Sequence, residues 1–283
     1  MRLPNPHRTP GSQFFGAGEA LGDIVEAFCD VDLADAAIAR ARTIKVLPTT
    51  SPVVIVHYRA PMASQRGVYR RTVNGMHIRA AMLKPCGPVG AVLVRLQAEA
   101  ADRVLGVKPA DLFDASIELS DIFGDGAAAL LEERLADAGS AVARVACMRD
   151  FLRRRTGPSR LDPLVAQAMR AIRRNPSISM RRLAGHLDVG ERSLQRRFKA
   201  ETGTSAKQFA RIERMQRAIA AHRAGVDWAG VAQASGFTDQ AHLIRDFRAL
   251  AGAPPEAFCR LAEAEQAWNT QLAVSDFYNT FVA

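Results

Sequence analysis

The sequence predicts a two-part protein, with an α+β first half and an all-α second half that contains a duplicated helix–turn–helix unit. Segments rich in β-branched residues gather before residue 98, and helical patterns dominate after it. Two stretches of the second half then repeat one pattern of apolar residues and turns. With 283 residues, of which 48% are hydrophobic, the chain is long enough for two domains with sizeable cores.

The first half contains three strong strand candidates, which are 44–48 (IKVLP), 52–58 (PVVIVHY) and 89–97 (VGAVLVRLQ). They are rich in Val and Ile and are interrupted by Pro, as expected of strands that end at turns. Residues 67–84 offer two more strands. The sequence therefore predicts a sheet-forming region before the helices begin.

Two amphipathic helices are predicted at 126–139 and 140–155, with Gly139 as the C-cap of the first and Ser140 as the N-cap of the second. The following stretch, 156–163 (TGPSRLDP), combines Gly, Ser and two Pro between helical patterns and is interpreted as a linker.

The repeat in the second half keeps its apolar positions and changes length only in a turn. Leu183, Ala184 and Val189 match Val231, Ala232 and Phe237 at an offset of 48, and Leu194, Phe198, Gly203 and Phe209 match Leu243, Phe247, Gly252 and Phe258 at an offset of 49. This pattern predicts two helix–turn–helix units. Between them, residues 206–223 form a predicted helix of about 27 Å.

The second helix of each unit is predicted to present a polar face opposite its apolar anchors. In the first unit, Leu194 and Phe198 face the core, and the outer face carries Arg192, Arg196 and Lys199, with Gln195 at its edge. In the second unit, which Thr238 is expected to cap, the outer face carries Ala241, Arg245 and Arg248, with Ile244 at the edge and Gln240 in the first turn. One such helix is an ordinary solvated face, but two in register favour helices that read base edges, because Arg pairs with guanine and Gln with adenine in the major groove.

The positive charge is concentrated in the repeat-bearing segment. The chain has a formal net charge of +9. Residues 164–260 hold 17 basic and 8 acidic residues, whereas residues 1–163 hold 21 and 18, and the remaining tail has three acids and no base. This distribution indicates an anionic partner, and double-stranded DNA fits the paired helices.

The segment from about Leu164 to Cys259 resembles the DNA-binding domain of the AraC/XylS transcriptional regulators. The resemblance rests on LAGHLDVGERSLQRRFKAETG, the connecting helix, GFTDQAHLIRDFRALAG and the closing APPEAF. It implies a seven-helix domain of two subdomains joined by a long helix. It also implies base contacts from Arg192, Gln195 and Arg196 in the first unit, and from Gln240, Ala241, Ile244 and Arg245 in the second. Ala241 and Ile244 depart from the polar residues often found there, which indicates either contact with a thymine methyl or less sequence information from the second unit.

For the rest of the chain, the resemblance implies a β-barrel-like sensor domain with helices following it, which binds an effector or forms a dimer. The expected organisation is a sensor or dimerisation domain at 1–155, the linker at 156–163, an AraC-type DNA-binding domain at 164–262 and a C-terminal tail at 263–283. The expected function is a sequence-specific transcription regulator, an activator, that binds double-stranded DNA. A small-molecule effector, RNA polymerase and a second copy of the chain are further candidate partners.

Other signals predict no catalytic, cofactor or metal residues. The four cysteines (Cys29, Cys86, Cys147 and Cys259) include no C-x-x-C pair and are interpreted as reduced thiols. His57 and His77 lack a third ligand at a readable spacing. Arg59, Arg79 and Arg95 alternate with apolar residues on strand candidates, which favours solvated strand faces over an anionic effector site. No signal peptide or membrane helix is evident, so a cytoplasmic, nucleoid-associated protein of bacterial type is expected.

An enzyme that carries the same DNA-binding module, such as a DNA-repair methyltransferase, is the alternative. That function requires a reactive cysteine in a Pro-Cys-His type of context. Cys86 follows Pro85 but precedes Gly87, so this signal is missing.

Overall fold

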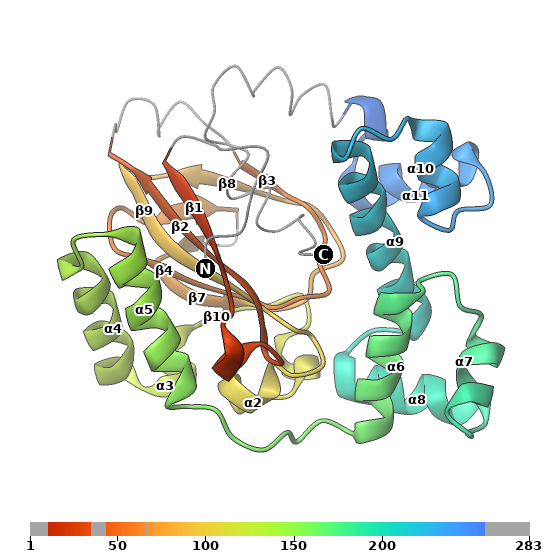
Figure 1. The fold of residues 1–283 in the computed structure, drawn as a ribbon, viewed down its shortest axis with the longest axis horizontal. Coiled ribbons are helices and arrows are strands. Elements are labelled where there is room, and N and C mark those ends of the chain that lie inside the picture. Colours follow the sequence, from red (N-terminus) through yellow and green to blue (C-terminus); the bar gives the residue numbers. More distant parts are fainter. Residues whose placement is uncertain (1–10, 35–43, 66, 258–283) are drawn as a thin grey trace.

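A computed structural model describes residues 11–34, 44–65 and 67–257 (Figure 1). They form a β-rich N-terminal region with helices after it, and an all-helical C-terminal region, which confirms the predicted fold class. The tail at 263–283, Cys259 and the repeat position Phe258 lie outside the described residues.

The strands of the N-terminal region form two antiparallel sheets. The six-stranded sheet runs in the order β1 (Ser12–Gly16), β2 (Val25–Leu33), β9 (Val89–Leu96), β4 (Val53–His57), β7 (Arg71–Asn74) and β10 (Ser116–Glu118). The four-stranded sheet runs in the order β3 (Ile44–Val46), β8 (Ala81–Pro85), β5 (Met62–Ser64) and β6 (Gly67–Tyr69). A shared apolar core joins them, with Ile55 and Leu93 from one sheet and Val46 and Met62 from the other. The barrel-like expectation therefore corresponds to two packed sheets.

The three strong strand candidates contain β3, β4 and β9, but β1, β2, β5 and β10 were not predicted. The region 67–84 also supplies three strands where two were expected, since β6, β7 and most of β8 lie in it. β2 was missed because Glu26, Asp30 and Asp32 interrupt its apolar pattern. These acids are tolerated in a strand since distant arginines pair with each of them.

Short helices and one helical layer complete the N-terminal region. They are η1 (Glu19–Leu21), α2 (Asp102–Leu105), η2 (Pro109–Leu112), α3 (Leu119–Phe123), α4 (Asp125–Asp137) and α5 (Ala141–Arg153). The layer of α3, α4 and α5 covers one face of the six-stranded sheet (Figure 1), and their apolar residues share a core with Val54, Val92 and Val94 of that face. The other face of this sheet lies toward the four-stranded sheet.

The two caps predicted between α4 and α5 have different outcomes. Ser140 is the N-cap of α5 and accepts a hydrogen bond from the Ala143 amide at 3.2 Å, as predicted. Gly139 is not the C-cap of α4, because Ala138 occupies that position. Ala138 is in an extended conformation, so the chain passes straight from the helix into the cap of α5 without a left-handed turn.

A buried ion pair fixes α5 on the sheet. The Arg144 guanidinium donates to both carboxylate oxygens of Asp30 on β2, at 2.7 and 2.8 Å. It also lies over the Tyr58 ring, 4.5 Å from its centroid. A two-pronged bond of this kind specifies direction as well as proximity, so it sets how the helix lies on the strand.

The C-terminal region consists of α6 (Pro163–Arg174), α7 (Met180–His186), α8 (Glu191–Thr202), α9 (Ala206–Arg223), α10 (Trp228–Ala234) and α11 (Gln240–Ala251). One apolar core joins α6, α7, α8 and the start of α9, and a second joins the rest of α9 with α10 and α11. The N-terminal region adds Met76 and Ala98 to the first core and Leu47 to the second. The connection at 156–163 is held by the buried Asp102 carboxylate, which accepts hydrogen bonds from Ser159, Arg160 and Leu161.

A cluster of buried charges lies where the two regions meet. We call Glu26, Arg95, Glu99, Arg173 and Glu213 the interdomain charge cluster. Arg95 on β9 binds Glu26 at 2.6 Å, and Arg173 on α6 binds both Glu26 and Glu99, the latter at 3.0 Å. Glu213 on α9 accepts a hydrogen bond from the Thr50 hydroxyl. The side chains of one region therefore complete the electrostatic environment of the other.

The pKa values of two carboxyls in this cluster, Glu26 and Glu213, are shifted in opposite directions. Burial alone would raise the pKa of Glu26, but Arg173 and Arg95 outweigh it and hold the pKa below its usual value. Burial raises the pKa of Glu213 to about 7, because Arg173, Thr50 and Arg217 compensate only in part and Glu26 adds repulsion. Glu213 is therefore partly protonated at neutral pH, whereas Glu26 stays charged.

The raised pKa of Glu213 predicts a loss of stability as the pH rises. Between about pH 4.5 and about pH 7 the folded protein holds a proton that the unfolded chain releases, so the free energy of unfolding falls with pH by up to about 3 kcal/mol. Glu213→Gln keeps an acceptor for Thr50 and should flatten this dependence in urea unfolding at about pH 5.5 and about pH 8. Glu133→Gln, on the exposed face of α4, is the matched control. An unchanged slope in Glu213→Gln would contradict the assignment.

Candidate nucleic-acid interface

The two helix–turn–helix units repeat each other at the level of single hydrogen bonds. Helices α7 and α10 are related by an offset of 48, and α8 and α11 by an offset of 49, as the sequence predicted. In each turn an amide bonds back five residues, from Val189 to Ala184 at 3.1 Å and from Phe237 to Ala232 at 2.9 Å. The second helices end on Gly203 and Gly252, whose φ angles are 75° and 74°.

The turns of the two units share a left-handed residue but differ in length. Asp188 and Gly236 occupy the same position of the repeat, with φ angles of 51° and 78°. The extra residue of the second unit falls directly before α11. Thr238 was expected to cap this helix, but Asp239 is the N-cap and accepts from the His242 amide at 2.7 Å. A carboxylate is a strong capping group near the positive end of a helix, so Asp239 takes the role.

The first candidate reading helix, α8, presents its predicted polar face to solvent. Leu194 and Phe198 are fully buried in the core. The exposed residues on the opposite face are Arg192, Gln195, Arg196 and Lys199. Within the described residues the three cations of this face form no ion pair, and the Gln195 amide donates to Glu191 at 3.0 Å. The face therefore holds cations whose donors are available to a ligand.

The second candidate reading helix, α11, has the same layout with a less polar face. Leu243 and Phe247 are buried. The predicted outer residues Gln240, Ala241, Arg245 and Arg248 are exposed, and Ile244 is half-buried. Ile244 thus lies at the border of the face, as predicted. The face of α11 holds two arginines and one glutamine, beside one Ala.

The C-terminal ends of the two candidate reading helices, α8 and α11, contact the N-terminal region. At the end of α8, Glu201 pairs with Lys108 at 3.0 Å, and a Cβ on Gly203 would lie only 2.6 Å from Cβ of Phe113. At the end of α11, the Leu250 carbonyl accepts from the Ala80 amide at 3.3 Å. The N-terminal halves of α8 and α11 are free of these contacts, and helix–turn–helix proteins read bases mainly with that half.

Helix α9 connects the two units, as predicted, but sequence reasoning did not foresee that its arginines hold them together. The buried Asp246 carboxylate on α11 binds Arg211 at 2.8 Å and Arg214 at 3.5 Å, both on α9. The Arg214 guanidinium also donates to the Pro176 carbonyl at 3.2 Å, in the stretch between α6 and α7. Asp246 follows an outward-facing Arg in the sequence, so the pattern gave no signal of its burial. The arrangement fixes the spacing of the two faces.

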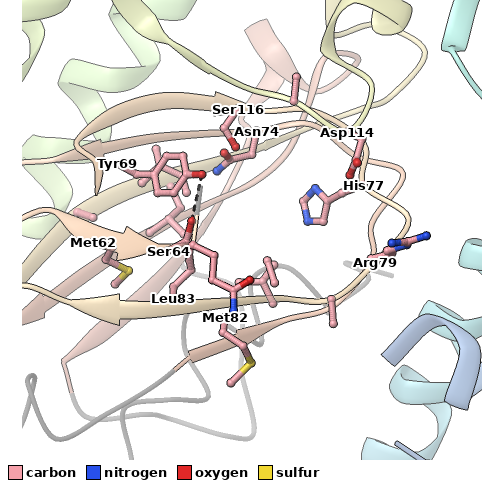
Figure 2. Close-up of a pocket in the computed structure, with 18 of the residues that line it drawn as sticks. Met62, Ser64, Tyr69, Asn74, His77, Arg79, Met82, Leu83, Asp114 and Ser116 are labelled. Carbon is pink, nitrogen blue, oxygen red and sulfur yellow. Dashed lines mark hydrogen bonds between the residues drawn. The ribbon is translucent and has the colours of Figure 1, made fainter. Parts of the chain in front are cut away.

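A cavity of about 380 Å³ lies between the two sheets of the N-terminal region (Figure 2). Its walls come from both sheets, with Ile55 and Leu93 on one side and Met62 and Leu83 on the other. Figure 2 shows Asn74 and Ser116 near each other in its wall, and Tyr69 beside Ser64, whose hydroxyl bonds that of Tyr69 at 3.1 Å. This volume suits a small organic molecule.

The arginines and histidines that the sequence singled out in the N-terminal region lie in several different environments. Arg95 was expected on a solvated strand face, which is wrong, because it is buried and paired with Glu26. Arg59 is exposed and pairs with Asp32, whereas Arg79 and both His57 and His77 line the cavity. In the part of the chain that the structure describes, no group of three or more His, Cys, Asp or Glu is arranged to hold a metal ion. Within the same residues, no helix combines the length and apolar character needed to cross a bilayer.

The exposed cations of α8 predict a measurable loss of specificity on mutation. Arg196→Ala should weaken binding to a cognate duplex by about 1–3 kcal/mol more than binding to a scrambled duplex, since an Arg that pairs with guanine discriminates by that amount. Fluorescence anisotropy with both duplexes measures the difference. Arg134→Ala, which removes one exposed Arg from α4, is the control for net charge. Equal losses on the two duplexes would assign Arg196 to phosphate contact only.

Comparison with known proteins agrees with this geometry. Residues 183–261 match the family described as "Helix-turn-helix domain". No curated protein matches the chain significantly.

Several solved structures are similar in fold. The C-terminal domain of AraT, a response regulator from Geobacillus stearothermophilus, is 24% identical and covers 36% of this chain and 88% of its own, with a TM-score of 0.35. ToxT from Vibrio cholerae, in a structure with a bound unsaturated fatty acid, is 12% identical and covers 89% of this chain and 96% of its own, with a TM-score of 0.45. At such identities the likeness concerns the fold alone. The C-terminal region of this chain carries an AraC-type helix–turn–helix domain, the DNA-binding module of the AraC/XylS transcriptional regulators.

Proposed function

We propose that the protein is a sequence-specific transcription regulator that places α8 and α11 in successive major grooves on one side of a DNA duplex. The observation that carries this proposal is the pair of exposed polar faces on two helices that occupy equivalent positions of one repeat. An α-helix fits the major groove, and base edges there form a distinct code for Arg and Gln side chains.

The proposed contacts divide into two classes. Arg192, Gln195 and Arg196 in the first unit, and Gln240, Ala241, Ile244 and Arg245 in the second, are assigned to base edges. Lys199 and Arg248 lie one turn farther along their helices and are assigned to phosphates. The second unit contributes fewer hydrogen bonds to bases, because Ala241 and Ile244 offer only apolar contact, which suits a thymine methyl.

The N-terminal region is proposed to be the regulatory part, with boundaries at 1–155 for this domain, 156–163 for the linker and 164–262 for the DNA-binding domain. The cavity between the sheets supports a small-molecule effector. We further propose that the protein acts as an activator. Its proposed partners are then a second copy of the chain and RNA polymerase. Such a protein would work at the nucleoid in the cytoplasm.

We propose no enzymatic activity, and the alternative of a DNA-repair methyltransferase has a direct test. Cys86 is exposed after β8, and its amide donates to the Pro61 carbonyl at 3.0 Å. Incubation with DNA that carries a labelled O-alkyl group should leave the protein unlabelled. Stoichiometric transfer of the label to Cys86 would show that the protein is a repair enzyme and would overturn the proposed function.

Selection from a random duplex pool, followed by footprinting, tests the main proposal. The full chain should select one motif and protect more than one helical turn, because α9, at about 27 Å, holds the two units apart on the scale of one turn. Recovery of no common motif would overturn sequence-specific recognition.

A break in α9 should uncouple the two units. Ile212 is fully buried in the core of the second unit, and Ile212→Pro removes a backbone hydrogen bond and clashes with the preceding turn, at about 3 kcal/mol or more. Affinity for the selected duplex should fall toward the non-specific level, where phosphate contacts persist and the dependence on salt stays steep. Ile212→Ala, which loses packing but keeps the helix, is the control. A folded Pro variant with unchanged affinity and footprint would show that the units act independently.

A further inference from the structure

Residues 76–81 run between the cavity and the DNA-binding domain, and we call them the shared segment. Their side chains are shared between two environments. Met76 belongs to the core of the first unit, and Ile78 and Ala80 pack against the core of the second. His77, Arg79 and Ala81 line the cavity, and Ala80 lines it as well. One short segment therefore touches the cavity and both helix–turn–helix units.

Hydrogen bonds tie this segment on both sides. The His77 amide donates to the Thr49 carbonyl at 3.2 Å, and the Met76 carbonyl accepts from the Asp114 amide at 2.8 Å. On the other side the Ala80 amide donates to the Leu250 carbonyl at the end of α11. Because packed cores deform little, a shift of the cavity wall here changes how α11 is held.

The cavity is lined by His57, whose Nδ1 the described residues leave without a hydrogen-bond partner. His57 lies two residues after Ile55 on β4, so the two side chains share a face of the sheet, and both line the cavity. The side chain is 2% exposed, and its Nδ1 has no hydrogen-bond partner within the described part of the chain. Burial, aided by Arg70, lowers the pKa of His57 to about 4, so the imidazole is neutral at neutral pH. Buried polar atoms without a partner are rare, and this one is available to a ligand.

The remaining walls define the chemistry of that ligand. Apolar side chains from both sheets provide most of the surface, and Ser64, Tyr69, Asn74 and Ser116 add neutral polar groups. The cation of the lining, Arg79, is exposed, and Figure 2 shows its guanidinium pointing away from the other labelled residues. Asp114 in the same wall would repel an anion. A neutral imidazole accepts or donates one hydrogen bond according to its tautomer, and a hydroxyl group satisfies either case.

We propose that this cavity binds an uncharged, largely apolar molecule with a hydroxyl group that bonds His57, and that the shared segment transmits its binding to the second helix–turn–helix unit. The site rests on the cavity alone, whereas the transmission rests on the proposed function. Thermodynamic linkage then requires DNA and ligand to change each other's affinity by the same factor.

Three naphthalene derivatives of similar shape test the ligand class. 2-Naphthol carries the hydroxyl, 2-methylnaphthalene replaces it by a methyl group, and 2-naphthoate carries a charge at neutral pH. Equilibrium dialysis of the full chain without DNA should give 2-naphthol an affinity at least about tenfold above both others. His57→Phe should abolish the difference between 2-naphthol and 2-methylnaphthalene. Equal affinities in the unchanged protein, tighter binding of 2-naphthoate, or no saturable binding of any probe would each overturn the proposed site.

The transmission has its own variant and control. Saturating 2-naphthol should change the dissociation constant for the selected duplex by about fivefold or more, and the duplex should change 2-naphthol affinity equally. Ile78→Ala, which is outside the cavity lining, should keep 2-naphthol affinity and reduce the change to less than about twofold. Leu130→Ala, on an exposed position of α4, should keep the full change. Transmission through this segment would be overturned if 2-naphthol changed DNA affinity as much in Ile78→Ala as in the unaltered protein, or if it changed DNA affinity in neither. DNA affinity measured without 2-naphthol tests the proposed function separately.

Discussion

The docking of the two regions depends on Glu26, a carboxylate that each region neutralises with one arginine. Arg95 comes from the neighbouring strand, and Arg173 comes from α6 of the DNA-binding domain. Removing one partner from a buried charge pair is far more costly than the pair itself is stabilising. The regions therefore have one strongly preferred relative position, and the directions of the guanidinium groups specify it. The placement of both reading helices relative to the cavity follows from that position.

Ion pairs within the protein account for part of the positive charge in the C-terminal half. The excess of basic residues in 164–260 favoured a nucleic-acid partner. Several of these arginines pair with carboxylates of the protein itself. Arg173 binds Glu26, Arg197 binds Asp162 at 2.7 Å, and Arg211 and Arg214 bind Asp246. The charge that faces outward on α8 and α11 is smaller than the composition suggests. Its position on two equivalent helices carries more information than its amount.

Sequence reasoning succeeded where structure is local and failed where it is not. The offsets and apolar anchors of the helix–turn–helix repeat were predictable because they depend on neighbouring residues, although the cap of α11 is Asp239 and not Thr238. Strand β2 was missed, since its acids look unfavourable until Arg95, Arg144 and Arg59 are brought to them from other elements. The cavity gave no signal in the sequence, because its lining comes from β3 through β10 and the turns between them. His57 looked like an isolated histidine, and only the fold shows what surrounds it.

The shared left-handed turn position is constrained differently in the two units. A side chain is present there in the first unit, where Asp188 is exposed. In the second unit a Cβ on Gly236 would meet Oγ of Ser177 at 1.7 Å, and that hydroxyl donates to the Gly236 carbonyl at 3.1 Å. Position 188 in the first turn can hold any residue that tolerates a positive φ. Position 236 in the second turn requires glycine, because Ser177 lies against it. The two turn positions are therefore not interchangeable, because Ser177, in the stretch before α7, contacts the turn of the second unit.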